Sequence, residues 1–137
     1  PFDDDGGNNT GSVYVYNPDG TGEVKINPAT PLANRNFGRS VAGGAGKIAV
    51  GCAFSDPGGL TNKGEAFLFN LDGTGEVNLT PPSTVASSDY FGWSVTIGEG
   101  KVAVGAYNDE DTGEPIMAHC STLECCYTDE FGISLDV

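Results

Sequence analysis

The chain repeats itself at an interval of 53 or 54 residues, and this repetition restricts its possible folds more than any other feature. Three blocks recur in the same order along the sequence. Residues 19–24 return at 72–77, residues 37–41 at 91–95, and residues 46–51 at 100–105. A third echo of the Phe-Gly block lies at residues 131–135. Three ordered matches do not arise by chance, so the sequence predicts tandem copies of one structural unit.

Each unit contains four short apolar or alternating runs bounded by Gly, Pro, Asn or Asp, which is the pattern of β-strands. The first and second predicted strands are 40–42 and 47–50, repeated at 94–97 and 101–104. The third and fourth are 65–69 and 76–79, with counterparts at 12–16 and 23–26. Gly-rich and Asp-Gly connections between these runs favour hairpins. The alternating apolar side chains predict a core between sheets, formed by Val13, Val15, Ile48, Val50, Phe67, Phe69, Val102 and Val104.

The recurring blocks resemble the FG-GAP repeat, the blade sequence of integrin-type β-propellers and of many bacterial surface and secreted proteins. The resemblance rests on Phe37-Gly38 and Phe91-Gly92, on the segments 50–52 and 104–106 where the family has Gly-Ala-Pro, and on the Gly-x-Val-Tyr-Val-Tyr run at 11–16. It covers about residues 1–111. The resemblance implies a propeller-type fold and an extracellular or cell-surface location, but a fold shared by many functions does not define one.

We therefore expect an all-β chain of tandem four-stranded antiparallel blades of β-propeller type, with about 2.5 repeats. Residues 1–36 would supply the third and fourth strands of a partial blade, 37–80 a central blade, and 81–137 a second blade with a divergent Cys-containing C-terminal tail. Propellers close with four to eight blades, so 137 residues should not close a ring alone. The predicted partners are other copies of the chain, joined head to tail into a ring or fibre, or the rest of a longer propeller. Because the chain begins at Pro1, we expect a processed product or a piece of a longer protein.

The charge of the chain excludes some partners. Nineteen acidic and six basic residues give a formal net charge of −13, which repels phosphate backbones and argues against nucleic acid. No apolar run approaches the length of a membrane-spanning helix, so we expect no membrane insertion. Divalent cations, basic proteins and neutral carbohydrates remain possible ligands.

Calcium is the first cofactor candidate that the sequence raises. In the family that the chain resembles, the calcium loop joins the first and second strands. Here those connections, 43–46 and 98–100, have almost no oxygen-bearing side chains, so the usual family site is predicted to be absent. Acidic clusters occur instead in the next connection, and their candidate ligands are Asp3, Asp5, Asn8, Asp109 and Asp111. The alternative, which the sequence favours, is a solvated loop that uses Asp, Asn and Gly for turn geometry.

Two other groups of residues suggest covalent or metal chemistry. His119 lies beside Cys120, Cys125 and Cys126, the residue types of a zinc site, although adjacent cysteines rarely suit one tetrahedron. The three cysteines are better candidates for a disulfide, whose pairing the spacing does not fix. Sequons place candidate glycosylation sites at Asn8 and Asn78.

The sequence predicts no enzyme. His119 is the only histidine, and no serine lies in a nucleophile-elbow motif. Tyr90 and Trp93 could stack against a sugar, although rings at these positions more often fill the wedge between blades. We therefore expect a non-catalytic extracellular structural or adhesion component that binds carbohydrate, protein or other copies of itself. The alternatives are a calcium-dependent or lectin-like binding module, or a fragment of a larger secreted propeller protein.

Overall fold

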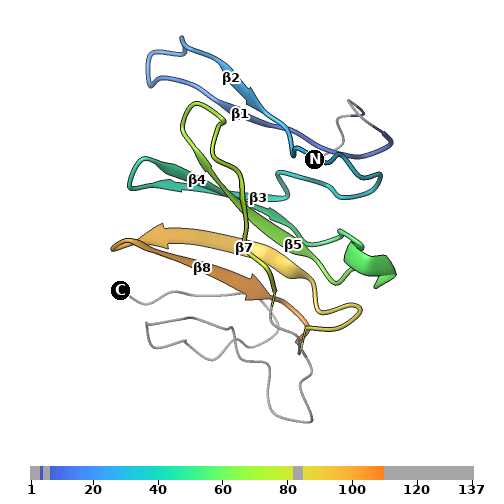
Figure 1. Ribbon diagram of the computed structural model, residues 1–137. Helices are drawn as coiled ribbons and strands as arrows, with labels where there is room; N and C mark the ends of the chain where they lie inside the picture. The colour runs from blue at the N-terminus through green and yellow to red at the C-terminus, as the bar shows by residue number, and fades with distance from the viewer. Residues whose placement is uncertain (1–3, 5–6, 82–84, 110–137) are drawn as a thin grey trace.

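The computed structural model describes residues 4, 7–81 and 85–109. In this part the chain is all-β, with three open antiparallel sheets stacked on one another (Figure 1). The first sheet contains β1 (Val13–Val15) and β2 (Val24–Ile26), and the second contains β3 (Ser40–Gly44), β4 (Lys47–Cys52), β5 (Glu65–Asn70) and β6 (Val77–Asn78). The third sheet contains β7 (Phe91–Gly98) and β8 (Lys101–Ala106), and a short 3-10 turn, η1 (Pro57–Gly59), precedes β5. The predicted fold class, blades of propeller type that do not close, is confirmed.

The central sheet has the order β3-β4-β5-β6, the meander of one complete four-stranded blade. Repeat positions relate the other two sheets to it. β1 and β2 correspond to β5 and β6, whereas β7 and β8 correspond to β3 and β4. The described stack is thus a complete blade between two half-blades, one made of third and fourth strands and the other of first and second strands.

Two-residue turns join the first and second strands of each unit. Ala45 and Gly46 have φ of 50° and 71°, and Glu99 and Gly100 have φ of 46° and 73°. Two successive positive φ angles define the type I′ turn, whose twist matches that of the flanking strands. The connection is therefore shorter than the predicted three or four residues, because the outer glycines continue the strands.

The apolar core lies between the sheets. At the first interface, Phe67 and Phe69 of β5 pack with Val13 and Ile26 of the first sheet, and Ile48, Val50 and Cys52 belong to the same cluster. Phe37 contacts both phenylalanine rings of β5, with centroid distances of 5.9 and 5.7 Å. Every side chain that the sequence assigned to the core is buried or packs against a buried cluster. Stability therefore comes mainly from contact between neighbouring sheets.

Small residues bring the second and third sheets close together. Gly51 of β4 faces Gly92 of β7, and a Cβ added to Gly51 would lie well inside 3.0 Å of the Gly92 carbonyl oxygen. The Ser40 hydroxyl donates a hydrogen bond of 2.9 Å to the same carbonyl. The Val-Gly pair that recurs in the sequence therefore sets the distance between blades.

The Phe-Gly block recurs because it ties each unit to the one before. The Phe37 N–H donates to the Thr10 carbonyl at 2.8 Å, and the Phe91 N–H donates to the Lys63 carbonyl at 2.9 Å. Both phenylalanine side chains are buried, and the glycine that follows each has a φ of 88°. At Gly92 a Cβ would collide with the Glu65 backbone, so only glycine suits this close approach.

Candidate functional site

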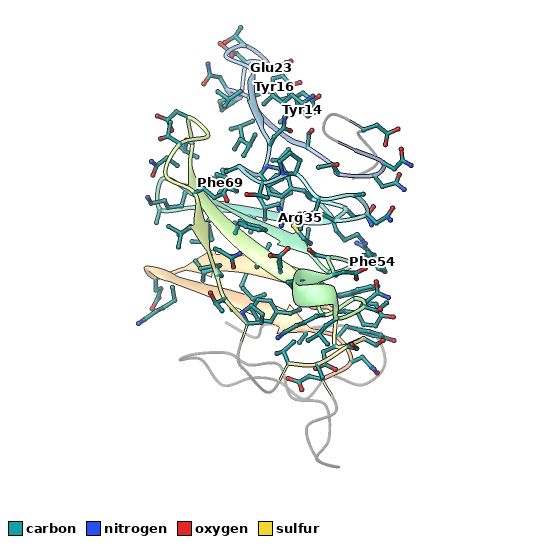
Figure 2. All side chains as sticks on the ribbon, turned by 45° about the vertical axis from the view of Figure 1, so that its right-hand side comes forward. Tyr14, Tyr16, Glu23, Arg35, Phe54 and Phe69 are labelled. Carbon is teal, nitrogen blue, oxygen red and sulfur yellow. The ribbon has the colours of Figure 1, made fainter. Side chains whose placement is uncertain are left out.

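Four aromatic side chains pack together near η1, at the end of the stack where several connections between strands lie. We call them the aromatic cluster. Its members are Phe54, Tyr90, Trp93 and Tyr107. The Trp93 and Tyr107 rings are stacked, with centroids 4.9 Å apart and an interplanar angle of 27°. The remaining contacts are edge-to-face, with centroid distances of 5.7–6.2 Å. Figure 2 shows Phe54 beside η1, at the end of the stack where these connections lie.

An arginine of the neighbouring blade extends the aromatic cluster. The Arg39 guanidinium carbon lies 4.6 Å from the centroid of the Trp93 ring. The two residues occupy equivalent repeat positions, so this cation–π contact runs from one blade to the next. Trp93, Tyr90 and Phe54 are half-buried, whereas Arg39 is exposed and Tyr107 is 41% exposed. The arrangement offers ring surface and a cationic group to solvent, and it also fills the space between blades.

The sequence identified Tyr90 and Trp93 as a pair, and the structure brings them into contact at 6.0 Å. It did not identify Phe54 or Tyr107, which are not repeated in the neighbouring units. Arg39 could have been recognised from the sequence, because alignment of the repeats places it at the position equivalent to Trp93. Ligand stacking by these rings stays a prediction.

A buried ion pair ties the connection between the first and second sheets to β5. The Arg35 Nε lies 3.1 Å from Glu65 Oε2, and both side chains are almost fully buried. The Ser55 hydroxyl also donates to Glu65 Oε2, and Arg35 Nη1 donates to the Thr30 carbonyl at 2.6 Å. The Arg35 guanidinium lies 5.2 Å from the Phe67 ring centroid. Figure 2 places Arg35 between the sheets, where it joins the connection before β3 to the start of β5. These contacts give the ion pair a structural role.

The Asp-Gly-Thr-Gly turns use their carboxylates for backbone geometry. Asp72 Oδ1 accepts hydrogen bonds from the Thr74 N–H and hydroxyl at 3.0 and 2.6 Å, and Asn70 Nδ2 donates to the same hydroxyl at 3.0 Å. Asp19 and Thr21 repeat the two carboxylate contacts at the same distances. In each turn, the hydrogen bond from the threonine hydroxyl is the main reason why the pKa of the aspartate lies below its usual value of 3.8. These bonds explain why the block recurs without invoking a metal.

The predicted calcium ligands are only partly described. Asn8 is exposed in the connection before β1 and Asp109 is buried after β8, whereas Asp3, Asp5 and Asp111 lie outside the described residues. Asp4 Oδ1 accepts the Asn9 N–H at 2.7 Å, which is a turn-forming contact. Within residues 4, 7–81 and 85–109, no three His, Cys, Asp or Glu side chains are grouped as metal ligands would be. The calcium site stays a prediction.

The cysteine and glycosylation predictions also stay untested. Cys120, Cys125 and Cys126, with His119, lie outside the described residues. Asn8 and Asn78, the two candidate glycosylation sites, are both exposed.

Cys52 is a free thiol at the end of β4 and is fully buried in the first core cluster. Burial raises the pKa of the Cys52 thiol far above its usual value, so the group behaves as a small apolar side chain.

The outer side of the first sheet carries two exposed tyrosines, and we call it the tyrosine face. It contains Tyr14 and Tyr16, which are 44% and 50% exposed, with Glu23, just before β2, nearby (Figure 2). Lys25 of β2 lies opposite Tyr14. The Tyr16 hydroxyl donates to Glu23 Oε2 at 2.9 Å, and Lys25 Nζ lies 5.5 Å from the Tyr14 ring centroid.

Repeat positions show what kind of surface the tyrosine face is. Tyr14 and Tyr16 correspond to Phe67 and Phe69, which are only 2% and 1% exposed because the first sheet covers them. The tyrosine face therefore occupies the positions that contact the neighbouring sheet in the central blade, and no sheet of the described residues covers it.

The described chain thus consists of stacked antiparallel β-blades, each tied to its neighbour through equivalent residues. The family model of the FG-GAP repeat matches residues 74–115, which run from the last turn of the central blade through β6, β7 and β8. The chain thus contains an FG-GAP repeat at these residues, and its internal repetition places equivalent blocks in the first two sheets. No curated protein matches the chain.

Two general properties accompany this assignment. The FG-GAP repeat family is generally non-enzymatic, and such repeats occur in extracellular proteins. None of the helical segments in the described residues is long and apolar enough to cross a membrane.

Proposed function

We propose that the chain is a non-catalytic structural or adhesion component outside the cell, built from FG-GAP blades and joined head to tail to further copies of itself. The observation that supports this most strongly is the tyrosine face. Its residues occupy positions that are buried between blades elsewhere in the same molecule. A surface of that type is suited to receiving another blade.

The charge of the chain supports contact through apolar surface. Two copies with a formal net charge of −13 repel each other at a distance. Salt screens that repulsion and strengthens apolar association, so self-association should increase with salt concentration. An assembly held by ion pairs would respond in the opposite direction.

Molar mass in solution tests the proposal. Light scattering after size exclusion, over a range of protein and salt concentrations, should show species larger than one chain, and electron microscopy should show rings or fibres. Tyr16→Lys should reduce the mass, whereas Leu60→Lys, which changes a residue of similar exposure beside η1, should not. A monomeric mass at every concentration would refute self-association. A preceding blade of a longer chain would then be the partner of the tyrosine face.

A lectin-like module is the second candidate function, and the aromatic cluster is the observation that favours it. Exposed Tyr107 offers a ring to the apolar face of a sugar, and Arg39 offers hydrogen bonds to its hydroxyl or carboxylate groups. Trp93 is the only tryptophan, so its fluorescence should report sugar binding directly. Tyr107→Ala should abolish a response that Tyr16→Ala leaves intact, and a panel of neutral and acidic glycans without any response would refute this function.

The calcium-dependent version of this module makes a separate prediction. Added calcium should raise the melting temperature and a chelator should reverse the rise, since an ion that binds only the folded chain stabilises it. An unchanged melting temperature at millimolar calcium would exclude a calcium-dependent module.

A further inference from the structure

We infer that β8 of one copy pairs edge to edge with β1 of the next copy, so that two half-blades complete one four-stranded blade. The inference rests on the head-to-tail association proposed above and specifies its interface. It follows from strand equivalence, register and side-chain complementarity.

Strand equivalence identifies the two edges. β4 pairs with β3 on one side and with β5 on the other. β8 corresponds to β4, and among the described strands it pairs only with β7. β1 corresponds to β5, and among the described strands it pairs only with β2. By this equivalence, the second edge of β8, which no described strand covers, suits a strand of the kind that β1 provides, and the open edge of β1 suits a strand of the kind that β8 provides.

The central blade fixes the register of this pairing. β4 and β5 are antiparallel, with Lys47 opposite Asn70 and Ala49 opposite Leu68. Transferred by the repeat interval, Lys101 lies opposite Asn17 of the next copy, and Ala103 lies opposite Val15. This register keeps apolar side chains on the same face as in the central blade, whereas a slip by one residue would reverse them.

A polar contact at one end of the β4–β5 pairing can be repeated between two copies. Lys47 Nζ donates to Asn70 Oδ1 at 2.5 Å, while Asn70 Nδ2 is held by the Thr74 hydroxyl. Asn17 is held in the same way, because its Nδ2 donates to the Thr21 hydroxyl at 3.2 Å. Lys101 of one copy and Asn17 of the next would therefore form the same contact.

The side chains on either side of the inferred pairing are also complementary. In the first interface the turn glycine Gly73 approaches Ile26 and Val24, with its Cβ position 3.3 and 3.4 Å from their side chains. Its counterpart Gly20 has open space around it, with no heavy atom within 4 Å of its Cβ position. Val77, the counterpart of Val24, is 51% exposed. Insertion of β1 and β2 of a second copy would bring Gly20 onto Val77 and cover both surfaces.

Cross-linking with engineered cysteines tests the register. Val15→Cys and Ala103→Cys lie directly opposite each other in the inferred pairing, and opposed residues of antiparallel strands are within disulfide range. One variant is isotopically labelled, the two are mixed with oxidised glutathione as oxidant, and peptide mass spectrometry locates the linkage. A disulfide between residues 15 and 103 of differently labelled copies is the expected result.

A shifted pair provides the control. Tyr14→Cys with Ala103→Cys places the two thiols on opposite faces of the sheet, so no linkage should form. Equal linkage in both pairs would overturn the inference. If light scattering shows association but residues 15 and 103 do not link, the pairing is refuted while head-to-tail assembly stands. If no association occurs, both are refuted.

Hydrogen exchange of the unmodified chain gives a measurement without mutation. The amides of β8 that face its second edge should exchange more slowly as protein concentration rises, because the next copy supplies carbonyl partners. Exchange in β8 that is independent of concentration in the associating range would contradict the pairing.

Discussion

Replacement of Gly51 by alanine is the sharpest test of the close contact between blades. Gly51 has an ordinary φ, so alanine introduces no backbone strain at this position. Its Cβ would instead collide with the backbone carbonyl of Gly92, which is held by Ser40. The Ser40 hydroxyl packs against the same carbonyl and also lies within 3.0 Å of the added Cβ, so the second and third sheets would have to separate by about 1 Å.

The loss of stability follows from the packing contacts that this separation weakens. A gap of about 1 Å forfeits up to roughly half of the dispersion energy of the contacts that it opens. The affected contacts are those of the second core cluster, which includes Ala66, Val85, Phe91 and Val104. Overpacking costs typically 1–3 kcal/mol, and we expect the upper end, about 3 kcal/mol, because backbone rather than a flexible side chain must yield. With an m-value of about 1.5 kcal/mol per M, the urea midpoint should fall by about 2 M.

The assay is equilibrium unfolding in urea, followed by the fluorescence of Trp93, which lies in β7 beside the altered contact. Gly98→Ala is the matched control, because Gly98 has an ordinary φ and no atom within 4 Å of its Cβ position. The control should stay within about 0.5 kcal/mol of the parent or be slightly more stable. Equal stability of Gly51→Ala and Gly98→Ala would refute the close packing of the two sheets.

Three further predictions concern individual side chains. The stability that the turn carboxylates contribute should be complete above pH 3.8 and should be lost as the pH falls through their folded-state pKa, which is lowered. The double variant Asp19→Asn with Asp72→Asn should therefore show a smaller fall of melting temperature with decreasing pH in this acid range. Cys52 should resist a thiol reagent in the native chain and react only on unfolding, and fast native labelling would contradict its burial. Arg35→Met or Glu65→Leu alone should cost about 3–5 kcal/mol, whereas the double variant should be more stable than either, as a double-mutant cycle would show.

The strands were predictable because each has a local signal. All eight described strands were located from alternation and from Gly, Asp-Gly and Asn-bounded turns, and all but one of their ends agree within two residues. The exception has a structural cause: β7 begins three residues earlier than predicted because Phe91 pairs with Ala106 across a bulge that skips Gly92 and Trp93.

The contacts between blades were not predictable, because they depend on how equivalent strands stack. The Arg35–Glu65 pair joins residues 30 positions apart, and the repeat places Asp89 and Ser12 at the equivalent positions, so no pattern marks the pair. Phe54 and Tyr107 join the aromatic cluster through the stacking of successive units rather than through any motif. Repetition predicts which residues are equivalent, but only coordinates show which face of one unit meets the next.

Amide hydrogen exchange measured by NMR would test most directly whether units one repeat apart form equivalent, stacked sheets. The Phe37 and Phe91 amides each donate to the connection of the preceding unit, at 2.8 and 2.9 Å, and the Asn36 and Tyr90 amides do so at 3.0 Å. Equivalent stacked sheets require strong and similar protection of both matched pairs. Exchange of these amides at the rate of an unstructured chain, or protection in one unit without its counterpart, would contradict such a stack.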